Sequence, residues 1–326
     1  TDITINGKMN VTTLSQEYET DPNQPLFILD GFETTLQTIS DLNMDRVESI
    51  SILKDAASTA IYGSKAANGV VVVETVKPKP GQLRGNYNGS LQIGWADLHD
   101  FRLMDSAQKL EYEKLAGEYG LLGPDGEIIS ESGMDKYYDK LKLVKSGYNT
   151  YWLNEPLRTA YSHAHNVYVD GGDSAFRYGI GLTYNKNMGV MKNSNRDVFS
   201  GHVTLNYRVD NFSFNSQTTI GNTDSNNETV SFSRFSRMNP FHEKRTADGE
   251  VPRYSYRYAG LSSQYEYVYN PLWDFEQNSF NKSNAHSVTE NFQMEWRILP
   301  TLRFRGNFQY QLSKTLAEVF VSPNET

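Results

Sequence analysis

The sequence predicts a mainly β protein in which a small α/β domain precedes part of a large antiparallel transmembrane β-barrel. Short apolar segments flank one Ala-rich helix before residue 80. After residue 81, polar and apolar residues alternate along about seven segments, as they do in barrel strands. A linker of Pro, Lys and Gly at 77–81 separates the two patterns, so we expect one domain over 1–80 and another over 81–326.

Composition excludes several classes of protein. The chain has 326 residues, a net charge of −8 and no cysteine. It contains no run of about 20 apolar residues, so a membrane-spanning helix is not expected. The acidic charge without a basic cluster argues against nucleic acid as a partner. The lack of cysteine excludes a disulfide framework and a thiolate metal site. We expect no cofactor.

The N-terminal domain is predicted from strand and turn signals. The strand LFIL ends at a turn pair, a second strand follows over 47–54, and an N-capped Ala-rich helix leads to a third strand, VVVV. We interpret the turns and caps mainly as structural, and the alternative is a switch region that touches the barrel wall. They form no phosphate loop, because the glycine-bearing turn follows the helix. The residues concerned are Asp30, Gly31, Lys54, Asp55, Tyr62, Gly63, Asn68 and Gly69.

Barrel strands are predicted from period-two alternation. The clearest segments are 87–95, 176–184, 199–209, 292–298 and 302–312, with weaker ones near 163–171 and 211–221. Their polar face is rich in Arg, Gln and Asn, which suits a water-filled lumen, and aromatic residues often lie at the strand ends. Alternation alone is also compatible with a soluble β-sandwich or a lipocalin-like barrel whose apolar face points inward.

The connections between the predicted strands differ greatly in length. Tight turns are expected at 171–173, 209–211 and 299–301, and long loops over roughly 97–160 and 221–288. We expect an amphipathic helix over 106–119. Tyrosines of the second long loop could stack on sugar rings, or they could pack against a partner or the barrel rim. They are Tyr254, Tyr256, Tyr258, Tyr265, Tyr267 and Tyr269.

The sequence shows no sign of catalysis. His163 and His165 share one strand face, a geometry that can bind a metal, but no third ligand lies nearby in the sequence, so no metal site is expected. The carboxylates are scattered, and neither a G-x-S-x-G nor an H-E-x-x-H motif occurs. We therefore expect the protein not to be an enzyme.

Two stretches resemble one known family. PLFILDG (25–31) and DRVESISILKDAASTAIYGSKAANGVVVVETVK (45–77) closely resemble the plug of SusC/RagA-type TonB-dependent transporters. Residues 152–190 resemble the early barrel strands of that family. This chain departs from the family pattern at two places. Asp170 stands before the Gly pair, where the family usually has Ser. Residues 75–78 replace the basic run that usually follows the last plug strand. Barrels of this kind have about 22 strands, so the chain is expected to be a fragment with the C-terminal part of the plug and about seven strands.

The resemblance implies TonB-dependent import of a nutrient across the bacterial outer membrane, with an oligosaccharide as the expected cargo. It implies as partners TonB, through an N-terminal segment, a SusD-like lipoprotein lid, an oligosaccharide or peptide substrate, and outer-membrane lipid. An outer-membrane adhesin or sensor without import is the main alternative. A soluble glycan-binding β-protein or glycoside hydrolase is disfavoured by the plug motif.

Overall fold

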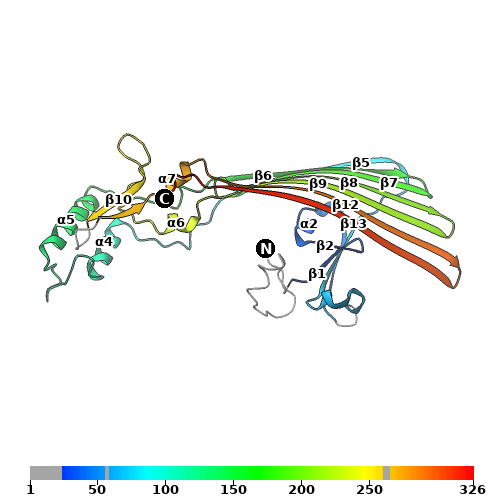
Figure 1. Cartoon of the computed structure of the whole chain (residues 1–326), viewed down its shortest axis with the longest axis horizontal. Helices are drawn as coiled ribbons and strands as arrows, with labels where there is room; N and C mark the ends of the chain where they lie inside the picture. The colour runs from blue at the N-terminus through cyan, green and yellow to red at the C-terminus, as the bar shows by residue number, and fades with distance from the viewer. Residues whose placement is uncertain (1–23, 56–58, 260–264) are drawn as a thin grey trace.

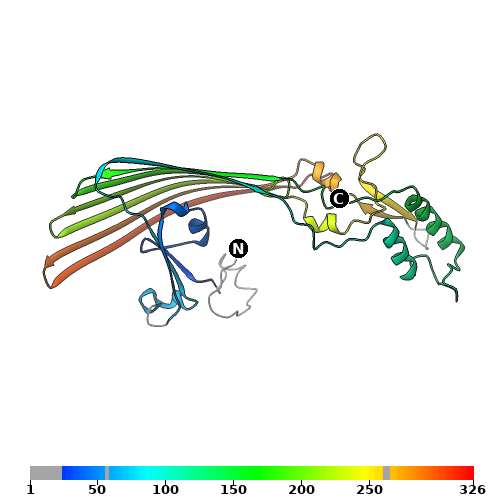
Figure 2. The ribbon, with the colours of Figure 1, turned by 180° about the vertical axis from the view of Figure 1, so that it is seen from behind.

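The structure consists of three parts that we name by their residues. The computed structural model describes residues 24–55, 59–259 and 265–326, with the backbone alone at 256–259 and 265–267. Seven long strands form a curved sheet, the wall, with the α/β unit (24–76) below its concave side (Figure 1). The head, formed by the connections 95–159 and 228–279, extends from one end of the wall, as the view from behind also shows (Figure 2).

The α/β unit is a mixed four-stranded sheet in the order β2-β1-β4-β3. Its strands are β1 (Leu26–Leu29), β2 (Phe32–Thr34), β3 (Val47–Leu53) and β4 (Val70–Thr75), and its helical segments are α2 (Leu36–Ser40), η1 (Met44–Arg46) and η2 (Ala60–Ala66). The central strand β4 is parallel to β1 and antiparallel to β3. Val71 and Val73 face one apolar cluster and Val70 faces another, which explains why this strand is apolar on both faces.

The helix predicted after Asp55 differs from the observed one. Thr59 N donates to Asp55 O at 3.0 Å, and residues 56–58 lie outside the described part. Gly63 has φ +71° and ψ −158°, a non-helical conformation that interrupts the segment Ala60–Ala66. The helical turn therefore stops at Gly63, as the sequence predicted, but a second 3-10 turn follows it to Ala66. A glycine permits a kink as readily as a stop.

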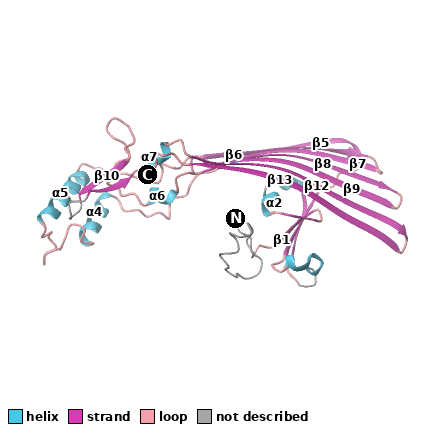
Figure 3. Ribbon diagram, viewed as in Figure 1, coloured by secondary structure: helices cyan, strands magenta, loops and turns pink. Residues whose placement is uncertain are grey.

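The wall confirms the seven predicted strands. Their order is β13-β12-β9-β8-β7-β6-β5, with every neighbouring pair antiparallel (Figure 3). The strands are β5 (Gly81–Gly94), β6 (Ala160–Gly172), β7 (Phe176–Met188), β8 (Asn195–Val209), β9 (Phe212–Asn227), β12 (Phe280–Leu299) and β13 (Leu302–Phe320). Tight connections at 173–175, 210–211 and 300–301 define the short-turn end, and the head lies at the long-loop end.

The two faces of the wall differ in chemistry. Side chains that face the α/β unit are mostly hydroxyls, amides and arginines, such as Thr204, Gln217 and Gln293. The opposite face exposes apolar side chains, including Leu91 at 68% and Phe308 at 61%. This is the alternation of a barrel with a polar interior and an apolar exterior. None of the helices in the described ranges has the length and apolarity needed to cross a membrane.

The head contains helices and a hairpin, only one of which the sequence predicted. Its elements are α4 (Ser106–Leu115), α5 (Glu131–Lys145), α6 (Phe232–Ser236), β10 (Tyr254–Ala259), β11 (Tyr265–Tyr269) and α7 (Pro271–Glu276). The helix expected over 106–119 corresponds to α4, which ends at Leu115. Trp152 of the first connection packs with Phe235 and Leu272 of the second, and Tyr119 packs with Phe241 in the same way. The two long connections therefore fold as one body.

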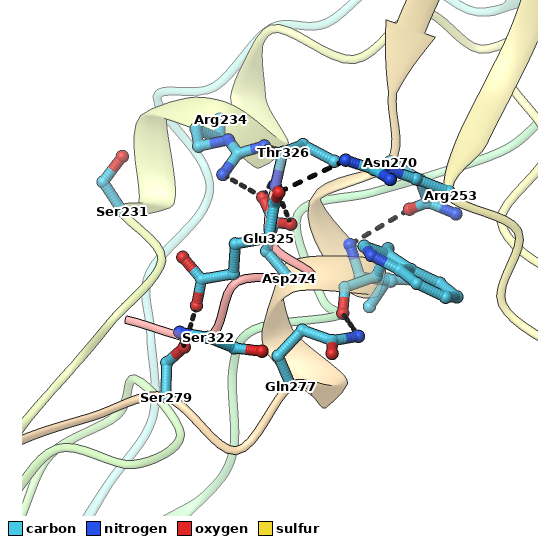
Figure 4. Close-up of polar contacts among 12 residues, drawn as sticks. Ser231, Arg234, Arg253, Asn270, Asp274, Gln277, Ser279, Ser322, Glu325 and Thr326 are labelled. Atoms are coloured by element: carbon cyan, nitrogen blue, oxygen red, sulfur yellow. Dashed lines mark hydrogen bonds and ion pairs between the residues drawn. The ribbon is translucent and has the colours of Figure 1, made fainter. Parts of the chain in front are cut away.

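A buried carboxylate joins the base of the head to the segment after β13 (Figure 4). Asp274 is fully buried and accepts hydrogen bonds from Arg234 at 2.5 Å and from Thr326 N at 2.9 Å. Nearby, Trp273 Nε1 donates to Asn324 O at 2.8 Å. Because a buried carboxylate without partners is very costly, these contacts fix the chain that leaves β13 against α7.

Candidate functional site

The contact surface between the α/β unit and the wall is the candidate site. Each of the seven strands directs at least one polar or cation–π contact at the α/β unit. The wall residues are Asn88 (β5), Tyr168 (β6), Asn185 (β7), Arg196 and His202 (β8), Gln217 (β9), Gln293 (β12) and Gln309 (β13).

The Asp30–Gly31 turn is one of the places where the α/β unit touches the wall. Both residues have positive φ, 51° and 90°, as a two-residue hairpin turn requires. The Asp30 carboxylate accepts from Thr75 N at 2.8 Å and from Gln217 Nε2 at 3.3 Å. Gln293 Nε2 donates to the Asp30 carbonyl at 3.1 Å, and a Cβ built on Gly31 would lie 3.0 Å from that nitrogen. The turn thus shapes the hairpin and docks it on β9 and β12.

Asp41, just after α2, forms the most complete polar contact with the wall. Arg196 NH1 and NH2 donate to its two carboxylate oxygens, each at 2.7 Å. Both side chains are about a quarter exposed. Asn185 Nδ2 adds a bond of 3.4 Å to the Asp41 carbonyl. This paired geometry is among the stronger hydrogen-bonded contacts that proteins make.

Arg46 contacts two rings of the wall. Its guanidinium carbon is 4.9 Å from the centre of the Tyr168 ring, and NH1 is 3.0 Å from His202 Nδ1. The Tyr168 and His202 rings stack at 5.8 Å. Burial lowers the pKa of Arg46, while Tyr168 and Asp30 oppose that shift. Since a guanidinium can only donate, His202 Nδ1 accepts, and its proton lies on Nε2.

The interface has polar groups and space for ordered water. A cavity of about 90 Å³ lies between the two parts and is lined by residues that include Asp41, Arg46, His202 and Asn291. Arg46 Nε, His202 Nε2 and Asn291 Oδ1 are buried there without a protein partner. A polar cavity of this size suits a few bridging waters. Each apolar cluster in the described residues lies within the α/β unit or within the head, so none crosses this interface.

Among the contacts that the structure describes, two of the predicted turn and cap residues meet the wall. Asp30 and Gly31 do so through the contacts given above. Tyr62 instead packs against Ala66 and Val70 inside the α/β unit. The remaining five lie around η2, where Gly63 and Gly69 have positive φ, Lys54 and Asp55 precede the helical turn, and Asn68 Nδ2 donates to Gln24 O at 3.5 Å.

Sequence reasoning missed the residues that form the strongest wall contacts. Asp41, Arg196 and His202 stand outside the stretches that carry the family resemblance, and Arg46 lies inside one of them but was not singled out. The usable signal was charge on the polar face of β8, where Arg196 and His202 share a face with Ser200 and Thr204.

The tyrosines predicted in the second long loop lie on the β10–β11 hairpin. Tyr254 and Tyr269 are cross-strand partners with ring centres 5.3 Å apart, and they are 37% and 47% exposed. Tyr256, Tyr258, Tyr265 and Tyr267 follow on the same strands, but their side chains lie outside the described part. A cross-strand ring pair stabilises a hairpin and leaves one face of the rings accessible.

His163 and His165 lie on the outer face of the wall. Their rings are 5.1 Å apart, and His165 Nδ1 is 2.7 Å from the Tyr87 hydroxyl. The residues that the structure describes contain no group of three or more His, Asp or Glu side chains placed to hold a metal ion.

The head contains a second cavity with positively charged surroundings. It measures about 530 Å³ and is lined by residues that include Lys109, Tyr151, Arg237 and His242. Burial, followed by the charge of Lys140, lowers the pKa of His242 to about 4. Glu113 beside it loses solvation, but hydrogen bonds from Lys140 and Tyr119, both 2.6 Å, hold its pKa below the usual value.

Comparison with known proteins identifies the two main parts. The family model for the TonB-dependent receptor plug domain matches residues 3–70. "TonB-dependent receptor SusC" of Bacteroides thetaiotaomicron is 31% identical over 203 residues, which cover 59% of this chain and 18% of the relative. "TonB-dependent receptor P3" of Formosa agariphila is 23% identical over 89% of this chain and 26% of the relative.

A solved structure shows the same fold. The RagAB peptide importer in its open-open state matches with a TM-score of 0.71 and 20% identity, over 93% of this chain and 36% of that chain. The chain spans between 6% and 26% of the length of the curated relatives that it matches.

Proposed function

Since this chain is of the SusC/RagA type of TonB-dependent outer-membrane transporters, we propose that it imports an oligosaccharide through the lumen behind the wall. Its family mediates nutrient import across the outer membrane and is not a class of enzymes. The α/β unit, from here on the plug, would block the lumen at rest. In this orientation the short-turn end faces the periplasm and the head faces outward.

One observation carries this proposal: the plug meets all seven strands through polar or cation–π contacts, and no apolar cluster of the described residues is shared. Separating an apolar interface costs about 25 cal/mol for each Å² exposed to water. Separating a hydrated polar interface exchanges protein hydrogen bonds for water hydrogen bonds, at about 0.5–1.5 kcal/mol each. A pulling force can therefore move the plug while the wall keeps its continuous ladder of backbone hydrogen bonds.

We assign the motif around η2 a structural role in this cycle. Tyr62 anchors the helical turn in the plug core, and Gly63, Asn68 and Gly69 return the chain into β4. Asp30 and Gly31 take the gating contact instead, because they alone of the predicted residues touch β9 and β12.

We propose that the head faces a SusD-like lipoprotein and the incoming cargo. Large apolar side chains are exposed on it, including Leu115 at 69% and Tyr138 at 59%. Tyr254 and Tyr269 offer rings that a sugar could stack on. The RagAB importer carries peptides according to its name, so a peptide is the second candidate cargo.

The test of import is growth. Deleting the gene is expected to abolish growth on one oligosaccharide or peptide source and to spare growth on its monomers. Unchanged growth of the deletion strain across a broad panel of both cargo classes would contradict import and favour an adhesin or sensor.

The test of gating uses the absence of cysteine from the chain. A bifunctional thiol reagent would link an Asp41→Cys/Arg196→Cys variant of the full transporter, joining plug to wall. Uptake is expected to stop on cross-linking and to return on cleavage of the reagent. The control pair Lys186→Cys/Asp197→Cys joins two neighbouring strands of the wall at opposite register positions, so its cross-linking should leave uptake intact.

A further inference from the structure

Arginine and lysine are sorted to opposite faces of the wall. All arginines of the seven strands occupy positions that face the lumen, namely Arg84, Arg177, Arg196, Arg208, Arg297, Arg303 and Arg305. The lysines Lys186, Lys282 and Lys314 occupy outward positions toward the long-loop end. Both residues supply positive charge, so the requirement inside the lumen is specifically for the guanidinium group.

Six of these arginines form a collar at the periplasmic end of the lumen. The arginine collar consists of Arg84, Arg177, Arg208, Arg297, Arg303 and Arg305, each within four residues of a strand's short-turn end. Figures 1 and 2 show the wall continuing past the plug to this end. A molecule that leaves past the plug must therefore cross the collar.

The collar has more cations than it has carboxylates. Glu295 accepts from Arg305 at 2.8 Å and lies 3.5 Å from Arg303 and 3.9 Å from Arg297. Asp170 accepts from Arg84 at 2.7 Å. Within the described ranges, no carboxylate approaches Arg177 or Arg208 within 4.0 Å.

A cavity brings the unpaired charges together. It measures about 510 Å³, and its lining includes Lys77, Arg177, Arg208 and Arg305 with Glu295 as the sole carboxylate, which leaves a net charge of +3. Amide side chains complete the lining, namely Asn206, Asn215, Gln293 and Asn307. The volume is in the range of small-ligand pockets, and the donors converge on one space.

The plug does not use this charge. Between residues 24 and 76 it has seven carboxylates and three cations, so it could have been the counterion. Within the described ranges, the ion pair between plug and wall joins Asp41 to Arg196, which lies outside the collar. Asp30 and Asp45 bond to the amides of Gln217 and Asn88, and Glu33 pairs with Lys65 inside the plug.

We propose that the arginine collar binds carboxylate groups of the cargo on the periplasmic side of the plug, and that the transporter prefers oligomers with several carboxylates. The proposal rests on the import function above and names its substrate class. A planar guanidinium bonds a carboxylate through two parallel contacts, which an ammonium cannot do. Positive charge in a narrow lumen with low-dielectric walls also concentrates anions there. Acidic oligosaccharides and acidic peptides share this chemistry.

The test measures binding to the purified full-length transporter by calorimetry. The probes are trigalacturonate and triglutamate, each beside its uncharged carboxamide form. The wild type is expected to bind the acidic probes more tightly than the amides. Arg177→Gln/Arg208→Gln is expected to weaken acidic binding by about tenfold or more, and Arg177→Lys/Arg208→Lys by less. Lys186→Gln/Lys314→Gln, an equal loss of two positive charges on the outer face, should change nothing.

Equal binding of acidic and amide probes by the wild type would overturn the proposal. An unchanged affinity in the Arg177→Gln/Arg208→Gln variant, or an equal loss of affinity in Lys186→Gln/Lys314→Gln, would do so as well. Preference for one acidic probe identifies the cargo as sugar or peptide. Acidic binding without uptake of any cargo would leave the collar standing and refute import, so the two failures are distinguishable.

Discussion

The plug and the head meet their neighbours in opposite ways. The plug touches the wall through amides, hydroxyls, one paired Asp41–Arg196 contact and a polar cavity. In the head, the two long connections share two apolar clusters, and α7 holds a fully buried carboxylate. The first kind of contact can be broken and re-formed in water. The second kind of contact, an apolar cluster, loses much of its stabilising free energy when a single large side chain is removed. It therefore suits a part of the molecule that keeps its shape.

Removing a core ring from the head should have the largest effect. Trp152 is buried to 1% exposure and packs against Phe235 and Leu272. Trp152→Ala is expected to destabilise the head by about 3–5 kcal/mol. Limited proteolysis of the intact transporter in outer membranes would detect this as early cleavage of the head, with the barrel still folded. Exposed Tyr138→Ala serves as the control, and equal cleavage of both variants would contradict the assignment.

Acid should weaken the head through one buried histidine. The fold lowers the pKa of His242 from 6.5 to about 4. Above pH 6.5 the residue is neutral whether folded or unfolded, so it imposes no penalty. As the pH falls from about 6.5 to 4, the unfolded state gains the proton and stability declines, by at most about 3 kcal/mol.

Proteolysis of the head across this pH range would reveal the decline. His242→Gln should flatten it. If the slope between pH 6.5 and 4 persists in that variant, another group carries the dependence.

Breaking the paired contact should loosen the plug by less. Asp41→Asn removes the charge and one of two acceptors from Arg196, at a cost of about 1–3 kcal/mol. Single-molecule pulling on the plug of the full transporter should give a lower release force. The nearby exposed Glu48→Gln is the matched charge control. The same release force for Asp41→Asn and wild type would show that the pair does not hold the plug.

The smallest effect concerns one turn. Gly31→Ala places a side chain at φ +90° and within 3.0 Å of Gln293 Nε2, whereas Gly126→Ala meets a similar φ of +74° with nothing within 4 Å. Each should lose about 1–2 kcal/mol from backbone strain. Only Gly31→Ala should also lower the release force. Equal release forces for the two variants would remove the turn from the plug–wall contact.

Much of this fold could be predicted because its patterns are local. Alternation along each strand and the turn pair Asp30–Gly31 depend on neighbouring residues, and they led to the seven strands and the mixed sheet. The head could not be predicted in the same way. Its helix α5 packs against a cluster that joins Tyr119 with Phe241, whose members are far apart in sequence.

Part of the candidate site could not be predicted from the sequence, because its contacts also join residues that are far apart in the chain. Arg196 pairs with Asp41 across 155 positions, and no spacing rule connects them. The motif around η2 was conspicuous in sequence because helix caps and turns need particular residues. Conspicuous residues can thus mark local backbone geometry, while the strongest contacts between the plug and the wall lie elsewhere.

The Asp274 cluster at the base of the head has a consequence for how the wall assembles. Strands β9 and β12 are neighbours over their full pairing, yet the second head connection separates them in sequence. The entropy lost in closing a loop grows with the logarithm of its length, so this pair would nucleate more slowly than one joined by a tight turn. A head that folds first, with Arg234 bound to Asp274, brings the two strand ends together. The long insertion would then act kinetically as a short turn, and β9 and β12 would pair from the outer end inward.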